Sequence, residues 1–228
     1  PVVEVSVAIS KPAATIKQGV YHVETPAKNQ LVEQILRERL KREDVRVLIF
    51  SGSKQRVREL SYHLRRRNFN ADAIHSDLTQ PQREEVLMKF KSGRVPVLVA
   101  TDVLSRGIDI KGIDLVINFD VPADAEDYVH RIGRTGRAEA DGEAITLVSR
   151  QDFRRMKRIE ALMQVQVARY DLPEGVQQPV ATQSGEKRGS NNSGNRNKRK
   201  RPPHWKKKNK SGNSSGQGAP PNAGPPVG

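Results

Sequence analysis

The sequence contains no cysteine, very few aromatic residues and no long apolar run. Without cysteine, the fold can contain neither a disulfide bridge nor a cysteine-ligated zinc site, and a reducing compartment such as the cytoplasm is expected. The five histidines show no paired ligand spacing, so we expect no metal site. No segment approaches the roughly 18 consecutive apolar residues that span a bilayer. These absences indicate a soluble protein without a membrane partner.

Charge is distributed unevenly along the 228 residues. Residues 1–175 contain 29 Lys+Arg against 25 Asp+Glu, whereas residues 176–228 contain 11 against 1. Most of the net charge of +14 therefore lies in the C-terminal tail. A mildly basic body with a strongly basic appendage predicts a polyanionic partner, and nucleic acid is the commonest soluble one.

Short apolar segments alternate with amphipathic helical patterns. Strands are expected at 19–24, 45–50, 71–75, 95–100, 114–119 and 143–148, and helices at about 25–36, 53–67, 81–91, 124–131 and after 152. Strands that are apolar on both faces predict an α/β fold, with a mostly parallel sheet and helices on both faces. Ligands of such sheets bind beyond the carboxyl ends of the strands, here the loops after Phe50, His75, Ala100 and Phe119.

The composition also divides the chain. We expect a linker at 1–15, one folded domain at 16–171 and a disordered basic tail at 172–228, where Pro, Gly, Ser, Asn, Lys and Arg dominate. The chain begins at Pro1 without an initiator methionine, so we expect a fragment or a processed product.

The segment YVHRIGRTGR, Tyr128–Arg137, is the most informative part of the sequence. It places three arginines and two glycines at regular spacing: Arg131, Arg134, Arg137, Gly133 and Gly136. Residues three apart are neighbours on a helix, so the three guanidinium groups are expected on one face, where they suit a dense anion such as a nucleoside triphosphate. The alternative is a solvated helix face whose arginines pair with the acidic residues at 124–127, although the two glycines count against it.

Three further segments occur in a fixed order before this one: VLIFSGS at 47–53, IHSDLTQPQREEVLMKF at 74–90 and VLVATDVLSRGIDI at 97–110. Together with YVHRIGRTGR they resemble the second, C-terminal RecA-like domain of the DEAD-box ATP-dependent RNA helicases. The resemblance covers about 16–162 and is nearest to the bacterial RhlE-like branch. It implies a RecA-like fold and the C-terminal half of an enzyme that unwinds or remodels RNA.

The resemblance also implies roles for individual residues. Arg134 and Arg137 match the positions that reach across an interdomain cleft to the γ-phosphate of ATP, one of them as an arginine finger, so both are catalytic candidates. Asp109 is expected near the ribose or in the interdomain network, although a lone carboxylate in that loop could equally be a cap. His130 matches a residue of the interdomain hydrogen-bond network and is given no proton-transfer role.

RNA contacts are expected with the backbone, because phosphates and 2′-hydroxyls carry little sequence information. The residues that the resemblance assigns to RNA are Ser51, Gly52, Arg83, Thr101, Arg106 and Gly107. Taken singly, Thr101 and Asp102 could be ordinary caps, and Arg83 a solvated helix residue. The sequence His75–Asp77 departs from the family, which more often has glycine in the middle position, and we interpret His75 as structural.

Some family motifs do not occur in this chain. It contains no phosphate-binding loop and no Asp-Glu-Ala-Asp motif, so ATP and Mg²⁺ would be held by an N-terminal RecA-like domain in cis, and the isolated chain should be inactive. An alternative function is an ATP-independent RNA-binding or annealing module. A DNA-directed relative is disfavoured by the motif set.

The tail contains the segment NRNKRKRPPHWKKKNK, Asn195–Lys210. It could tether RNA, with Trp205 stacking on a base, act as a nuclear import signal, or only aid solubility. We favour the tether, because a fluctuating polycation raises the local RNA concentration without a fold of its own.

Overall fold

The computed structural model describes residues 15–102, 110, 112–136 and 141–177. All of them belong to one compact unit, Pro1–Thr182, and a second unit, Gln183–Gly228, lies outside the described residues. Residues 1–14 of the expected linker also lie outside them.

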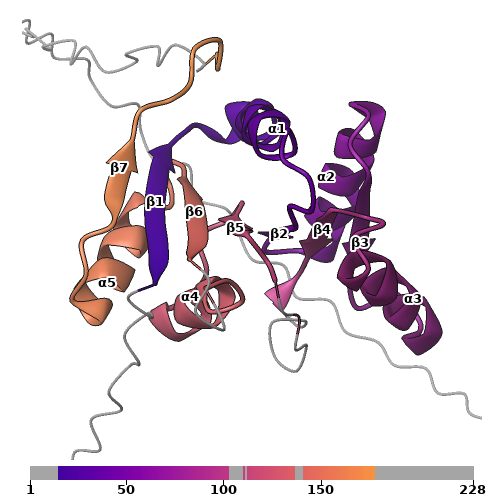
Figure 1. Ribbon diagram of the computed structural model, residues 1–228. Coiled ribbons are helices and arrows are strands. Elements are labelled where there is room, and N and C mark those ends of the chain that lie inside the picture. The colour runs from indigo at the N-terminus through magenta and orange to yellow at the C-terminus, as the bar shows by residue number, and fades with distance from the viewer. Residues whose placement is uncertain (1–14, 103–109, 111, 137–140, 178–228) are drawn as a thin grey trace, which may run out of the picture. The chain divides into compact units, whose positions relative to one another are not determined.

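The described residues form a single parallel sheet flanked by helices (Figure 1). The strand order is β3-β4-β2-β5-β6-β1-β7, and every pairing is parallel. The strands are β1 (Ile16–His22), β2 (Val47–Phe50), β3 (Ala71–Ile74), β4 (Val97–Ala100), β5 (Leu115–Asn118), β6 (Gly142–Val148) and β7 (Ala168–Tyr170). The helices are η1 (Thr25–Ala27), α1 (Lys28–Arg39), α2 (Lys54–Arg66), α3 (Gln80–Lys91), α4 (Ala125–Ile132) and α5 (Phe153–Met163). The predicted α/β fold with a parallel sheet is confirmed.

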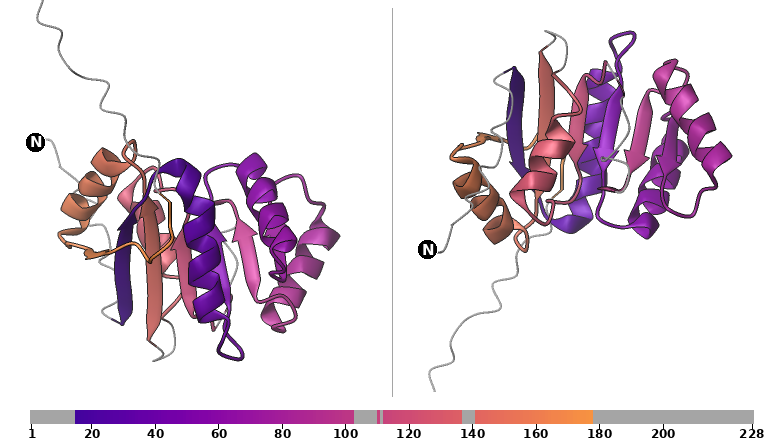
Figure 2. Two further views of the ribbon diagram at one scale, coloured as in Figure 1. Left: turned by 90° about the horizontal axis from the view of Figure 1, so that it is seen from above. Right: turned by 90° about the horizontal axis from the view of Figure 1, so that it is seen from below.

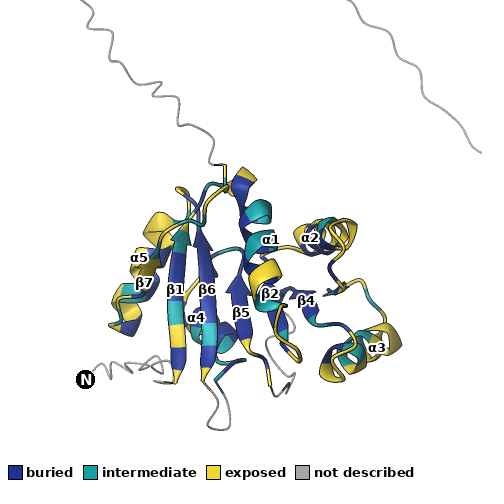
Figure 3. Ribbon diagram, turned by 45° about the horizontal axis from the view of Figure 1, so that its top comes forward, coloured by how far each residue is buried: buried dark blue, intermediate teal, exposed yellow. Residues whose placement is uncertain are grey.

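Side-chain alternation along the central strands explains why both faces of the sheet are covered. Val47 and Ile49 of β2 pack with the apolar sides of α1 and α2, while Leu48 and Phe50 pack on the other face with Phe90 of α3. A further cluster joins β1 and β6 to α4 and α5. Two opposite views show the helices on both faces (Figure 2), and the burial colouring shows buried strands beneath half-exposed helices (Figure 3).

Two strands differ from the sequence-based expectation. β1 begins at Ile16 and ends at His22, because its pairing with β6 runs from Ile16 opposite Gly142 to His22 opposite Val148. The edge strand β7 was not expected at all; only three residues long, it pairs with β1 and has too short a pattern to stand out from the chain around it.

Residues 172–177, which the sequence assigned to the tail, lie against α1. Gln30 Nε2 donates to the carbonyl of Gly175 at 2.6 Å, and its Oε1 accepts from the backbone N–H of Gln177 at 3.1 Å. Leu172 and Val176 pack against the apolar cluster beneath α1. The packed chain therefore continues beyond the expected boundary at residue 171, because two apolar residues and two backbone groups find partners on α1.

Candidate functional site at the carboxyl edge of the sheet

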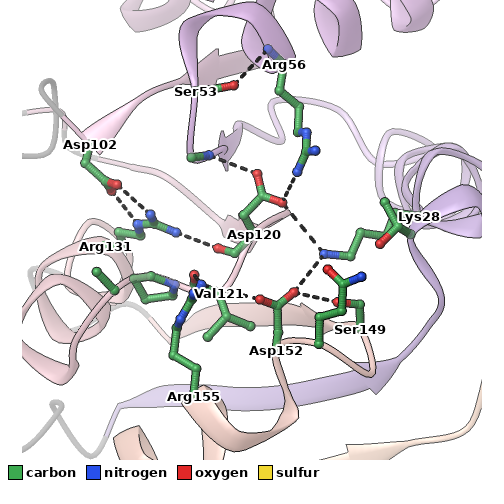
Figure 4. Close-up of a pocket in the computed structure, with 15 residues that line it drawn as sticks. Lys28, Ser53, Arg56, Asp102, Asp120, Val121, Arg131, Ser149, Asp152 and Arg155 are labelled. Carbon is green, nitrogen blue, oxygen red and sulfur yellow. Dashed lines mark hydrogen bonds and ion pairs between the residues drawn. The ribbon is translucent and has the colours of Figure 1, made fainter. Parts of the chain in front are cut away.

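The loops that follow five strands enclose a cleft of about 660 Å³ at the carboxyl edge of the sheet (Figure 4). Gly52 and Ser53 follow β2, and Arg56 lies on the first turn of α2; Asp102 follows β4 and Asp120 follows β5. Ser149 and Asp152 follow β6, and the first turns of α1 and α5 add Lys28 and Arg155. The cleft is strongly polar, as expected for the edge where parallel α/β sheets bind ligands.

The carboxylate of Asp120 contacts several residues of the cleft. Its Oδ2 accepts hydrogen bonds from the Ser51 hydroxyl at 2.7 Å and from the Gly52 backbone N–H at 2.9 Å. Its Oδ1 accepts from Arg56 Nη1 at 2.7 Å and lies 3.8 Å from Lys28 Nζ. One carboxylate therefore fixes the loop after β2 and the first turn of α2, whose N-cap is Ser53.

Lys28 is buried at the start of α1, on the side that carries Leu31 and Ile35. Its Nζ donates to the carbonyl of Phe119 at 2.7 Å and lies 3.7 Å from Asp152 Oδ2. Asp152 in turn accepts a hydrogen bond from the Ser149 hydroxyl at 2.7 Å. The ammonium group therefore joins the loops after β5 and β6 to α1.

Burial and neighbouring charges shift the pKa values of Lys28 and Asp120. Burial lowers the pKa of Lys28, and the neighbouring carboxylates of Asp120 and Asp152 oppose that shift without cancelling it. Burial raises the pKa of Asp120, but the hydrogen bonds from Gly52 and Ser51 and the charges of Lys28 and Arg56 outweigh it, so the net pKa is lowered.

Arg131 is buried beneath the cleft rather than presented to a ligand. Its Nε and Nη2 donate to the two carboxylate oxygens of Asp102 at 2.5 and 2.6 Å, and its Nη1 donates to the carbonyl of Asp120 at 2.8 Å. Its guanidinium also lies 5.4 Å from the ring centroid of Phe50. The expected face of three converging guanidiniums is therefore wrong for Arg131, and so is the alternative pairing with the acids at 124–127.

The helix end explains this separation. α4 ends at Ile132 and Gly133 is its C-cap, so Arg134 lies beyond the helix and does not continue the face of Arg131. Arg134 Nε donates to the carbonyl of His130 at 3.2 Å, and its side chain borders an apolar hollow lined by Leu48 and Ile74 among others. Arg131 and Arg134 thus face different surroundings. Arg137 lies outside the described residues.

Four of the expected RNA-binding residues lie in the described part of the chain, along one half of the carboxyl edge. Ser51 and Gly52 follow β2 and hold Asp120, and Thr101 follows the adjacent strand β4. The Thr101 hydroxyl is buried and has no hydrogen-bond partner within the described part of the chain. Arg83 lies on α3, where its Nη2 donates to the carbonyl of Ser76 at 2.9 Å. Arg106, Gly107 and Asp109 lie outside the described residues.

The two histidines singled out in the sequence lie at the edges of this region. His75 is buried, and burial lowers its pKa, so the imidazole is uncharged near neutral pH. This accords with a structural role. His130 precedes Arg131 on α4, and its Nδ1 is buried without a hydrogen-bond partner among the described residues.

Sequence reasoning missed Lys28 and Asp120. A signal existed for Lys28, since it lies three and seven residues before Leu31 and Ile35 and therefore on the apolar side of α1. A lysine on such a side must find partners when it is buried. Asp120 directly follows a buried strand at the functional edge, a position that equally fitted an ordinary loop residue.

Two donors of the loop after β2 are not available to a phosphate. In strand–loop–helix sites for nucleotides, backbone N–H groups at the helix start receive the phosphate oxygens. Here the N–H of Gly52 and the hydroxyl of Ser51 are already occupied by the carboxylate of Asp120. Among residues 15–102, 110, 112–136 and 141–177 no group of three His, Asp or Glu side chains could hold a metal ion. In the same part of the chain, no helix is both long enough and apolar enough to cross a membrane.

Comparison with known families gives one domain match. Residues 27–139 match the helicase conserved C-terminal domain. Among curated proteins, the DEAD-box ATP-dependent RNA helicase CshA of Bacillus cereus is 49% identical over 126 residues, which are 55% of this chain and 24% of that protein. The chain spans less than a quarter of the length of the first curated relatives that it matches, 22% and 24%.

Solved structures agree with this match. The Escherichia coli DEAD-box protein SrmB, bound to regulator of ribonuclease activity A, superposes with a TM-score of 0.63 at 32% identity, covering 68% of this chain and 90% of that chain. Saccharomyces cerevisiae Dbp5, bound to RNA and ADP BeF3, superposes with a TM-score of 0.66 at 28% identity, covering 70% of this chain and 42% of that chain.

Proposed function

Because this chain belongs to the helicase C-terminal domain family and is the C-terminal RecA-like domain of a DEAD-box helicase, we propose that it forms half of an ATP-dependent RNA helicase. In the whole protein it would pair with an N-terminal RecA-like domain in cis that holds ATP and Mg²⁺. The observation that carries the proposal is the gathering of Ser51, Gly52 and Thr101 at one edge of the sheet, after the adjacent strands β2 and β4.

The nucleotide role falls on Arg134 and Arg137, with Asp109 near the ribose. Phosphoryl transfer places charge on the γ-oxygens, which a preorganised guanidinium stabilises. In this domain the Asp120 carboxylate occupies the Gly52 N–H and the Ser51 hydroxyl, so these two donors of the loop after β2 are not available to the nucleotide phosphates. Supplying a cation from this domain would tie ATP hydrolysis to domain closure.

RNA would lie along the carboxyl edge. We assign its backbone contacts to Ser51, Gly52, Arg83, Thr101, Arg106 and Gly107. At Ser51 and Gly52 the contact is with a sugar 2′-hydroxyl, which can donate to the Asp120 carboxylate that already occupies the donors of these two residues. The unpartnered hydroxyl of Thr101 supports this assignment, because a buried donor without a partner is costly unless another group completes it. The basic tail would tether further RNA.

The test uses a protein that contains both RecA-like domains. Arg137→Ala should reduce RNA-stimulated ATP hydrolysis by about 10³-fold, the usual contribution of an arginine finger, while RNA affinity stays near wild type. Arg42→Ala is a suitable control, because the Arg42 side chain forms no ion pair or hydrogen bond within the described part of the chain and lies on the opposite edge of the sheet. Wild-type turnover in Arg137→Ala would remove this residue from the catalytic assignment.

Several finer points belong to the same proposal. The chain by itself should hydrolyse ATP no faster than buffer, and stimulated turnover by the purified 228 residues would contradict this. We also propose membership of the RhlE-like branch, which a tree of full-length sequences would test, and a cytoplasmic location, which imaging of the tagged full-length protein would test.

A further inference from the structure

We propose that the far half of the carboxyl edge carries a second RNA site, a pocket for one base beside a row of cations for the adjoining phosphates. The pocket, called here the His22–Phe153 pocket, has a volume of about 300 Å³ and is bordered by His22, Glu24, Ser149, Arg150 and Phe153. The cations are Arg154, Lys157 and Arg158 of α5, called here the α5 cations. This site rests on the proposed function, since it extends the RNA path of the same domain.

The pocket has the shape and chemistry of a base-stacking site. The rings of His22 and Phe153 lie 5.6 Å apart between centroids, and Phe153 is 39% exposed. Lys157 Nζ lies over the Phe153 ring, 4.8 Å from its centroid, so a base that stacks on this ring is also next to one of the α5 cations. Burial lowers the pKa of His22, so its ring is neutral near pH 7 and offers an aromatic face rather than a charge. Aromatic faces bind unpaired bases with little sequence preference, as a general RNA-remodelling protein needs.

Glu24 decides between a base and a phosphate as occupant. Its carboxylate borders the pocket 4.0 Å from Arg150 Nε, so the two opposite charges balance and leave the pocket no net positive charge to attract a phosphate group. The same carboxylate can accept a hydrogen bond from an exocyclic amine of a base. The pocket therefore suits a base, and the phosphates must lie outside it.

The α5 cations provide the place for those phosphates. They are exposed and spaced i, i+3 and i+4, so they share one side of the helix. Within the part of the chain that the structure describes, no carboxylate lies within ion-pair distance of them. The acidic residue of the same helix, Glu160, is turned to Arg169, 2.8 Å away. The three charges lie within about 6 Å of helix axis, enough for about two successive phosphates.

The position of the pocket fits a continuous RNA path. Ser149 borders both this pocket and the large cleft, so the two hollows adjoin. From β2 to β1 the sheet crosses β5 and β6, a distance of roughly 15 Å at the usual strand spacing. A strand that contacts Ser51 and Gly52 could therefore reach His22 within a few nucleotides.

The first experiment measures the affinity of the two-domain protein, tail included, for a 20-nucleotide single-stranded RNA at several salt concentrations. The triple variant Arg154→Gln, Lys157→Gln, Arg158→Gln should bind about tenfold more weakly near 0.1 M salt, with the slope of log K against log salt reduced by about 1 to 2. The matched control removes three other cations without carboxylate partners in the described chain, Arg37, Arg42 and Arg66, by the same change to Gln. Equal weakening in both triples would overturn the site, because it would show only a general loss of charge.

The second experiment tests the base pocket. Phe153→Leu keeps an apolar side chain but loses the ring, and should weaken binding about fivefold without changing the salt slope. Tyr62→Leu is the matched control, since Tyr62 is an exposed aromatic residue on α2 with Arg66 over its ring. Unchanged RNA affinity in Phe153→Leu would overturn the base pocket. If the α5 triple kept its RNA affinity but lost the binding of an acidic peptide, the α5 cations would be a peptide site and not an RNA site.

The two proposals fail differently. If the wild-type protein shows no RNA-stimulated ATP hydrolysis, the proposed function fails, whereas the affinity comparison between the variants can still be made. If ATP hydrolysis is normal at saturating RNA and the α5 triple binds RNA like wild type, only the second site fails. Thermal unfolding of each variant checks that the fold is kept, and folded variants with wild-type affinity count against the site.

Discussion

Two pairs of cations border the same cleft and differ in burial. The side chains of Lys28 and Arg131 are each 2% exposed, whereas those of Arg56 and Arg155 are 45% and 48% exposed. The buried pair is enclosed by carboxylates and backbone carbonyls of this chain, so its charges set loop positions. The half-exposed pair can still reach a ligand. Formal charge at a cleft therefore says little about ligand binding until burial and partners are known.

The largest effect should come from the buried guanidinium. Arg131→Met removes the buried guanidinium that donates to the Asp102 carboxylate and the Asp120 carbonyl, and should lower the free energy of unfolding by about 3 kcal/mol or more. Chemical denaturation measures the loss. Adding Asp102→Asn should recover part of it, because the carboxylate that lost its guanidinium partner is then replaced by a neutral amide. A loss below about 1 kcal/mol would show that Arg131 contributes no more to stability than an exposed cation, so that burial would not distinguish the two pairs.

The buried ammonium should matter less. Lys28→Met removes the donor to the Phe119 carbonyl and one neighbour of Asp120 and Asp152, but Asp120 keeps Ser51, Gly52 and Arg56. We expect a loss of about 2–3 kcal/mol in the free energy of unfolding. Lys54→Met is the control, since Lys54 is 55% exposed and pairs with Asp77 at the surface. Equal losses in the two variants would show that burial does not separate the cations.

The same contrast explains what the sequence could predict. The apolar strands, their parallel direction and the helices on both faces follow from local patterns of hydrophobic residues. The family motifs also pointed to the correct domain. The roles within the arginine segment could not be separated, because Arg131 and Arg134 share a spacing but lie on opposite sides of a helix end at Ile132. The partner of Arg131 lies 29 residues away in sequence, a pairing that only the folded sheet creates.

Asp120 gives the next smaller effect, and it depends on pH. Its pKa is lowered in the folded state, so its carboxylate contributes stability above the unfolded pKa near 3.8, and this contribution is lost as pH falls through the folded pKa. Asp120→Asn should cost about 1–2 kcal/mol at pH 7 and less at pH 3, so the two unfolding curves should converge in acid. A difference that stays constant between pH 7 and pH 3 would show that the charge of Asp120 does not matter.

The smallest effect is expected for a half-exposed cation. Arg56→Gln removes one donor to Asp120, whose other partners remain, so the free energy of unfolding should change by less than about 1 kcal/mol. Because solvent screens this pair, even that change should shrink in 1 M salt, whereas the loss in Arg131→Met should persist. Parallel denaturation of the two variants at low and high salt checks this. If the Arg56 effect were instead large and insensitive to salt, Arg56 would be a structural residue like Arg131, and exposure alone would not identify the cations available to a ligand.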